Sequence, residues 1–161
     1  MITIEVKDRQ VLDMLNRLMR GMADTTPVMA DVAAGLLSQS ERQFATESGP
    51  FGPWPDLSDT TKALRTERGT WPGKMLQASG ALAASVQAAH GNGWASIGSN
   101  KPYAAMQFFG GTTSSTSMIP GKAIPARPFL PFHPETHELT PQAEASVLDV
   151  LTSWLDQLID G

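Results

Sequence analysis

The sequence predicts an α+β fold, in which a mostly antiparallel sheet of about four or five strands packs with two long N-terminal helices and a C-terminal helix. Three observations favour this fold. Apolar residues recur at helical spacing in two N-terminal stretches and again near the C-terminus. An Asn-Gly pair at positions 92 and 93 separates two apolar stretches, which is typical of a tight hairpin. The length of 161 residues, with 41% apolar, suits one domain over residues 1–161.

The composition excludes several classes of protein. There is no cysteine, so disulfides and thiolate chemistry are ruled out. No run of about 18 apolar residues occurs, so we expect no membrane-spanning helix and no membrane partner. The N-terminal stretch MITIEVKDRQ lacks the apolar core of a signal peptide.

The net charge of −4 is distributed unevenly along the chain. Residues 68–134 contain no acidic residue, and residues 135–161 contain no basic one. One interpretation is that each part only solvates its own surface. The other is that a basic face meets an acidic face across a subunit contact. The basic residues of the first part are too dispersed for a nucleic-acid footprint.

The N-terminal part begins with an expected strand. Ile2, Ile4 and Val6 alternate with polar residues, which is the period of a half-buried strand. Asp8 is in position to cap the helix that follows. The apolar stripe of that helix comprises Val11, Leu12, Leu15, Leu18, Met19 and Met22. We expect this stripe to be part of the core.

A second helix is predicted over residues 27–46. Thr26 is a suitable N-cap, and proline is favoured at the first helical position. Its apolar stripe, also expected in the core, comprises Met29, Val32, Ala33, Leu36, Leu37 and Phe44.

An aromatic loop, ESGPFGPWP, follows at residues 47–55. Exposed aromatic side chains on such a loop would indicate a partner contact. Alternatively, Trp54 folds back as a lid on the core, which is the favoured interpretation.

Ser58 or Asp59 is expected to cap the next, short helix. Lys62, Arg65 and Arg68 follow at three-residue spacing and so share one face of it. This face is either simply solvated, which is favoured, or it contacts phosphate or an acidic neighbour.

The middle of the chain predicts short elements separated by turns. After a loop carrying Trp71, two strands are expected over residues 83–90 and 94–98, joined at Asn92-Gly93. Residues 103–109 are long enough for about two helical turns, and Gly110 ends them.

The Ser/Thr-rich stretch at residues 112–117 is too polar for a core. We expect it to connect two strands, one leaving Gly111 and one entering Ala123. We also expect it to be mobile in the free protein and ordered only in an assembly. The prolines that follow fix the backbone into a rigid turn that presents Arg127 and Phe129.

The C-terminal part, residues 134–161, is predicted to be a linker followed by an amphipathic helix over residues 142–159. The apolar stripe of the helix comprises Val147, Leu148, Leu151, Trp154, Leu155 and Leu158. This helix covers either its own sheet or that of a neighbouring subunit.

No motif for catalysis or metal binding stands out. His133 and His137 are four residues apart, but Pro134 between them argues against a regular helix that would present both to a metal. No phosphate-binding glycine loop and no nucleophile elbow occur. We therefore expect no enzyme activity, no metal and no cofactor.

Several short motifs, taken in their order and spacing, resemble one known family. They are Trp54-Pro55-x-Leu57, Thr61, Met75-Leu76-x-x-Ser79-Gly80-x-Leu82-x-x-Ser85, Ile97-Gly98, Tyr103-Ala104, Gln107-Phe108-x-Gly110 and Ile124-Pro125-Ala126-Arg127-Pro128-Phe129-Leu130. Together they resemble the phage virion morphogenesis family of tail-completion and tail-terminator-like proteins, over about residues 44–131. Two positions depart from the family's pattern, which usually has His at Met106 and Gly at Pro131.

The resemblance implies a structural virion protein that acts at the head-proximal end of a phage tail. It would end tail-tube growth or join the tail to the head, as a homo-oligomeric ring, expected to be hexameric, around the DNA channel. The implied partners are further copies of the chain, the tail tube protein and head-tail connector proteins. Genomic DNA would pass through without specific binding. The implied locations are the tail or neck of the virion and, during assembly, the host cytoplasm.

Under this interpretation some residues are expected at a subunit or partner interface, because arginine and aromatic residues often anchor interfaces. These residues are Trp54, Trp71, Gln107, Ser115, Lys122, Arg127, Pro128 and Phe129. The alternative is that Phe129 belongs to the core and that Arg127 pairs with a carboxylate inside its own subunit.

A second hypothesis is a nucleic-acid-binding accessory protein that uses Lys62, Arg65 and Arg68, with Trp71 and Lys74 nearby. It predicts strongly salt-dependent affinity for DNA. The negative net charge and the acidic C-terminal part weigh against it.

Overall fold

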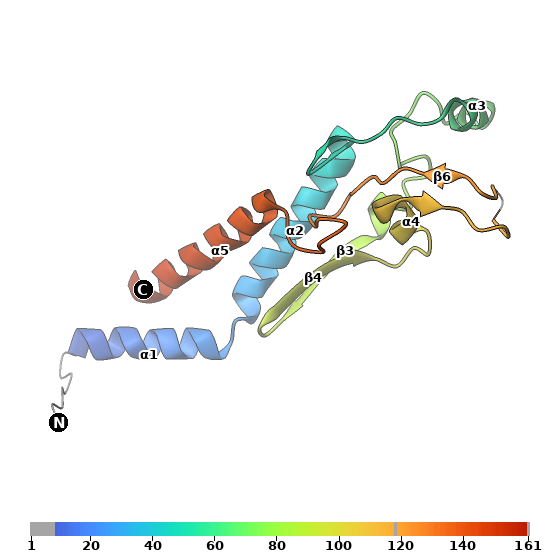
Figure 1. Cartoon of the computed structure of the whole chain (residues 1–161). Helices are drawn as coiled ribbons and strands as arrows, with labels where there is room; N and C mark the ends of the chain where they lie inside the picture. Colours follow the sequence, from blue (N-terminus) through green and yellow to red (C-terminus); the bar gives the residue numbers. More distant parts are fainter. Residues whose placement is uncertain (1–8, 118, 161) are drawn as a thin grey trace.

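Figure 1 shows the computed structural model of the chain, which describes residues 9–117 and 119–160. The long helix α2 (Thr26–Thr46) is the central element, and the other elements pack along it or extend from its ends. The fold is α+β, as predicted, because helices combine with short antiparallel strand pairs. The strand expected at residues 2–6 and the Asp8 cap lie outside the described residues.

The two predicted N-terminal helices are confirmed as α1 (Arg9–Ala23) and α2. The cap of α2 differs from the prediction, because Thr25 and not Thr26 occupies the N-cap position. The Thr25 hydroxyl donates to Oδ1 of Asn92 at 2.8 Å. The Asp24 carboxylate accepts a hydrogen bond from the Thr26 backbone N–H at 3.0 Å. Hydrogen bonds from Thr26 lower the pKa of Asp24.

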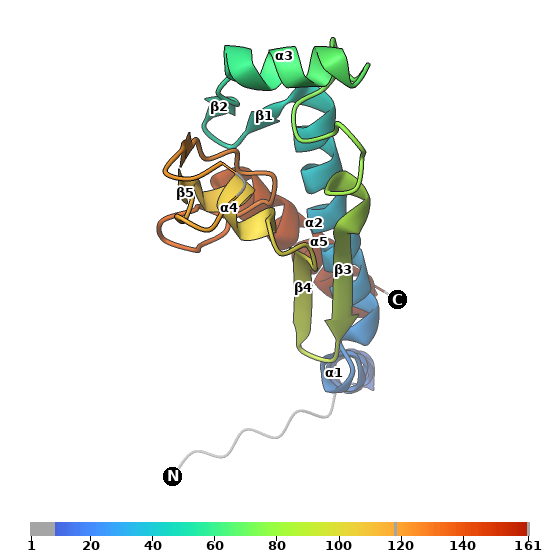
Figure 2. The same ribbon diagram turned by 90° about the vertical axis from the view of Figure 1, so that its right-hand side faces the viewer.

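The predicted hairpin is confirmed. Strands β3 (Val86–Gly91) and β4 (Trp94–Ser99) are antiparallel, and Gly91 pairs with Trp94, which leaves Asn92-Gly93 as a two-residue turn. Gly93 has φ of +80°, a conformation that favours glycine. The hairpin packs against α2, and the Asn92 side chain donates to the Ala23 carbonyl at 3.1 Å, so its tip is tied to the α1–α2 junction (Figure 2).

The predicted sheet of four or five strands is wrong for the described residues. Besides β3–β4, the structure has two separate two-stranded pairs, β1 (Ser48–Gly49) with β2 (Gly52–Pro53) and β5 (Gly111–Thr112) with β6 (Ala123–Ile124). Prolines at or directly after β1, β2 and β6 withhold donors and stop the pairing from extending. The start of the strand predicted over residues 83–90 is instead the 3₁₀ turn η1 (Ala83–Ser85).

Two short helices match the sequence prediction. Ser58 caps α3 (Asp59–Glu67), and its hydroxyl accepts the Thr61 backbone N–H at 3.3 Å. Helix α4 (Ala104–Phe109) ends at Gly110, which has φ of +71°. A Cβ at Gly110 would also lie 2.7 Å from the Ala126 nitrogen. Conformation and close approach therefore both require glycine there, and they bring the residue 124–131 segment against α4.

Helix α5 (Pro141–Asp160) packs along α2 and reaches α1, so it covers helices of its own subunit (Figure 1). Arg17 of α1 donates to the Leu158 and Ile159 carbonyls at 3.2 and 2.9 Å, which satisfies acceptors at the end of α5. No helix within the described part of the chain is long and apolar enough to cross a membrane.

The core has two clusters on different parts of α2. The larger one is aromatic and forms near the C-terminal end of α2; it comprises Phe44, Trp54, Leu82, Val86, Ala104, Phe108 and Phe129. The smaller one, between α2 and α5, comprises Val32, Leu36 and Ala143. The predicted stripe of α2 is therefore largely confirmed as core, although Met29 and Leu37 are only partly buried.

The prediction that the apolar residues of α1 belong to the core is wrong. Helix α1 has no buried residue, and the exposed fractions of Leu15 and Met19 are 44% and 70%. The reason is geometric: α1 lies beyond the hairpin tip (Figure 2). It contacts the end of α5 through the side that carries Arg17 and Gly21, and it is bonded to the hairpin at Ala23. The rest of its apolar surface faces solvent.

Candidate interaction surfaces

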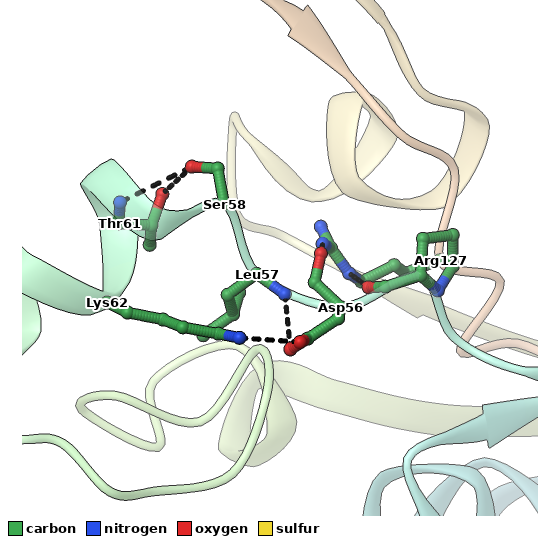
Figure 3. A network of polar contacts seen from close by, with 7 residues as sticks. Asp56, Leu57, Ser58, Thr61, Lys62 and Arg127 are labelled. Atoms are coloured by element: carbon green, nitrogen blue, oxygen red, sulfur yellow. Dashed lines mark hydrogen bonds and ion pairs between the residues drawn. The ribbon is translucent and has the colours of Figure 1, made fainter.

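The proline-rich segment at residues 124–131 is held in place by Arg127 (Figure 3). Its backbone N–H donates to the Gln107 carbonyl at 2.8 Å. Its Nε donates to the Pro55 carbonyl at 2.9 Å, and Nη2 donates to the Asp56 carbonyl at 2.9 Å. One buried arginine therefore joins the aromatic loop, α4 and the proline-rich segment.

The Asp56 side chain is occupied by other donors. Its Oδ2 lies 2.6 Å from Nζ of Lys62, and its Oδ1 accepts the Leu57 backbone N–H at 2.7 Å. These hydrogen bonds lower the pKa of Asp56. Burial lowers the pKa of the Arg127 guanidinium, and the nearby Asp56 charge opposes that shift. Arginine remains charged in proteins, so the two carbonyls compensate a buried cation.

Trp54, Pro128 and Phe129 lie in the same region as Arg127 and were also predicted at an interface. The exposed fractions of Trp54 and Phe129 are only 4% and 1%, and Trp54 Nε1 donates to the Pro128 carbonyl at 2.9 Å. The Ser40 hydroxyl donates to the Phe129 carbonyl. Trp54 and Phe129 are therefore core residues of the free subunit and Pro128 is half-buried, because the polar groups of the segment are used inside the subunit. That these residues take part in a contact stays a prediction. Trp54 is a lid on the core, as the favoured interpretation had it.

Arg127 differs from both interpretations given for it. It is buried, so it does not present its guanidinium to a partner. Its two side-chain hydrogen bonds go to backbone carbonyls and not to a carboxylate. We call the group formed by Trp54, Arg127, Pro128 and Phe129 the aromatic centre.

The four remaining predicted contact residues lie nearer the surface. Ser115 and Lys122 are exposed in the loop between β5 and β6. Gln107 and Trp71 are half-buried, and Lys62 Nζ lies 5.5 Å from the centroid of the Trp71 ring. The structure does not bring these four together into one patch with the aromatic centre, and their role in a contact stays a prediction.

Two of the three basic residues predicted to share one face of α3 have partners inside the subunit, whereas Arg68, at the C-cap, is exposed. Lys62 pairs with Asp56, and Arg65 Nη1 donates to the Lys74 carbonyl at 2.9 Å. Lys74 Nζ donates to the Ala45 carbonyl at 2.9 Å. These side chains stabilise the loop that follows α3, which weighs against the nucleic-acid hypothesis.

A cavity of about 510 Å³ lies beside Arg127, between α3, α4 and β6. Its polar lining includes Ser58, Thr61 and Gln107, without histidine. No group of three or more metal-binding side chains occurs within residues 9–117 and 119–160. His133, once considered with His137 for metal binding, uses Nδ1 to accept the Glu135 backbone N–H at 3.1 Å.

A second hollow, of about 420 Å³, is apolar. It lies between β4, α4 and the segment at residues 129–137, and we call it the α4 groove. Its largest lining side chains are Phe108, Phe109, Phe129 and Phe132. Sequence reasoning missed this groove, because residues from three separate segments form it.

A second missed surface is the exposed apolar face of α1, formed by Leu12, Leu15, Met19 and Met22. We call these four residues the α1 stripe. Leu148, Leu155 and Ile159 of α5 are exposed as well. Large exposed apolar areas mark sites of protein–protein contact. The geometry thus defines a class of protein, a structural subunit with a hydrogen-bonded centre and apolar outer surfaces.

Comparisons with known proteins are more specific. The chain belongs to the phage virion morphogenesis family, whose profile matches residues 6–156. It is 32% identical over 160 residues to "Mu-like prophage FluMu G protein 2" of Haemophilus influenzae, which covers 99% of both chains. It is 34% identical over 132 residues to "Putative capsid assembly protein G" of Escherichia phage Mu, covering 80% of this chain and 81% of that one. No solved structure matches the chain.

The family and these names indicate a structural protein of phage assembly and not an enzyme. The resemblance seen in the motifs between Trp54 and Leu130 is thereby confirmed, and the match extends well beyond them.

Proposed function

We propose that the chain is a structural subunit at the head-proximal end of a phage tail, where copies form a ring around the DNA channel. The ring completes or terminates the tail, or joins it to the head. One observation supports the proposed ring: fourteen large apolar side chains of the described residues are exposed in the isolated subunit. Such a subunit gains stability when neighbours cover that surface.

The position at the head–tail junction is supported by family membership and by the printed name of the phage Mu relative, which refers to capsid assembly. A net charge of −4 also suits a channel through which DNA slides, because phosphate contacts would retain the DNA. The partners on this proposal are further copies of the chain, the tail tube protein and the head-tail connector.

A knockout in infected cells tests the position. Without the protein, we expect separate heads and separate tails, or tails of irregular length, in electron micrographs of lysates. Complementation with the intact gene should restore joined particles. Normal joined particles from the knockout would contradict the proposal.

A further inference from the structure

We infer that subunits of this protein associate head to tail, with the α1 stripe of one copy inserted in the α4 groove of the next. This inference rests on the proposed ring and names the surfaces that would build it.

The α1 stripe has the spacing of a helix that binds in a groove. Leu12, Leu15, Met19 and Met22 are separated by three, four and three residues, so they line one side of α1. Groove-binding helices use anchors at this i, i+3, i+7 spacing. Helix α1 has 15 residues and is thus about 22 Å long, enough to present all four anchors to one partner.

Helix α1 is held rigidly in an extended position. Arg17 binds the last carbonyls of α5, and Gly21 allows close packing, since a Cβ there would lie 2.4 Å from a methyl carbon of Leu158. Thr25 and Asn92 fix the following turn to the hairpin tip. A preorganised helix loses little conformational entropy on binding.

The α4 groove offers the matching surface. Its lining is mainly apolar and includes four phenylalanines, of which Phe109 is 48% exposed, whereas Phe108 and Phe129 form its buried floor. Burial of leucine and methionine side chains against such rings is favourable.

The charges beside the two surfaces are complementary. Arg9 and Arg20 are exposed along one edge of the α1 stripe, where Asp13 is also exposed, so two positive charges there stand against one negative charge. Glu135 is exposed in the segment at residues 129–137 that forms a wall of the α4 groove, and the exposed Glu138 directly follows that segment. Opposite charges at the rim of an interface favour one orientation and suppress others.

The placement of the surfaces selects a second copy as the partner. Helix α1 lies beside the tip of the β3–β4 hairpin, whereas α4 lies at the other end of that hairpin (Figures 1 and 2). The hairpin strands have six residues each and so separate the two surfaces by about 20 Å. Two different surfaces at opposite ends of a subunit give a head-to-tail contact, which closes into a ring when the rotation per subunit allows it.

Cross-linking between two single-cysteine variants tests the inference directly, because the native chain has no cysteine. Leu15→Cys marks the stripe, and Ala105→Cys marks the groove. A short bis-maleimide should cross-link the two variants when they are mixed, and neither variant alone. Leu64→Cys replaces Leu15→Cys in the control, since the exposed fractions of these helical leucines are 45% and 44%.

Charge reversal supplies a second measurement. Arg9→Glu with Arg20→Glu should weaken self-association about tenfold or more, since like charges then meet at the rim. Adding Glu135→Arg and Glu138→Arg in the same chain should restore it. Circular dichroism checks that each variant is folded.

Four outcomes would overturn the inference. Cross-linking of Leu15→Cys to itself would show a symmetric contact between α1 helices. Capture of another virion protein by Leu15→Cys would show that the α1 stripe binds that protein and not a second copy of the chain. Rings that form without the Leu15–Ala105 cross-link would place the subunit contact elsewhere and leave the proposed function intact. If the native chain forms no oligomer in solution or in virions, the inference and the proposed ring both fail.

Discussion

The aromatic centre and helix α1 differ in burial: the centre buries its apolar side chains and pairs its polar groups, whereas α1 exposes its apolar side chains. In the centre, Phe129 is 1% exposed, and the Pro128 and Phe129 carbonyls accept hydrogen bonds from Trp54 and Ser40. In α1, no residue is buried, and the four residues of the α1 stripe face solvent. The centre is complete within one subunit, whereas we propose that a partner completes the α1 end.

The difference shows how one small subunit can combine a well-packed interior with an exposed apolar surface. Hydrogen bonds from Arg127 and Trp54 join the aromatic loop to the proline-rich segment, whereas α1 is held separately by Arg17 and Asn92. The following predictions alter one region at a time, beginning with the largest expected effect.

Phe129→Ala should have the largest effect on stability. Truncating a buried phenylalanine costs about 3–5 kcal/mol in the free energy of unfolding, through lost burial and a cavity. Phe109→Ala is the matched control, because Phe109 is 48% exposed and should cost far less. Urea unfolding followed by circular dichroism measures both. Equal losses would show that the centre is not the main core.

Arg127→Met should have the second-largest effect on stability. It leaves the Pro55 and Asp56 carbonyls without their donor, at about 1–3 kcal/mol for each one that stays buried and unpaired. Arg127→Lys should rescue only part of this, since lysine lacks the forked donors. Arg68→Met, at an exposed position, should be nearly neutral. If Arg127→Met keeps full stability and loses only assembly, Arg127 is an interface residue after all.

Asp56→Asn should have a small, pH-dependent effect. The hydrogen bond from Lys62 lowers the pKa of Asp56 in the folded protein. The ion pair therefore stabilises the fold above the ordinary aspartate pKa of about 3.9, and this stabilisation is lost as pH falls through the lowered value. The native chain should exceed the variant slightly in thermal midpoint at pH 7, and the gap should close in acid. A gap that widens in acid would reverse the assigned sign.

In the β5–β6 loop, we expect assembly to change the rate of amide hydrogen exchange and not the stability of the fold. Ser114, Ser115 and Thr116 are exposed, whereas the Thr113 N–H donates to the Lys122 carbonyl at 2.9 Å. We expect amides 114–116 to exchange rapidly in the monomer and more slowly after assembly. Hydrogen exchange with mass spectrometry checks this. Slow exchange in a monomer would show that the loop is ordered without a partner.

Local patterns predicted the local elements well. The α2 stripe, the Asn92-Gly93 turn, the Ser58 cap and the end of α4 at Gly110 all follow from residue types within a few positions. Such features depend on backbone conformation and helical spacing, which a short segment determines by itself.

Long-range features could not be read in the same way. An exposed apolar stripe has the same spacing as a buried one, so nothing in α1 itself distinguished Leu15 from Leu36. The Arg127 side chain meets carbonyls at Pro55 and Asp56, more than 70 residues earlier. The α4 groove likewise needs three distant segments, so it exists only in the folded chain.

The most direct measurement is the mass of the protein in solution across concentration, by light scattering, for the native chain, Leu15→Asp and Leu64→Asp. The two leucines are equally exposed on helices, so both variants should remain folded. We expect a closed multimer for the native chain and Leu64→Asp, and a monomer for Leu15→Asp. Identical masses for all three proteins would contradict the claim that a partner completes the α1 end.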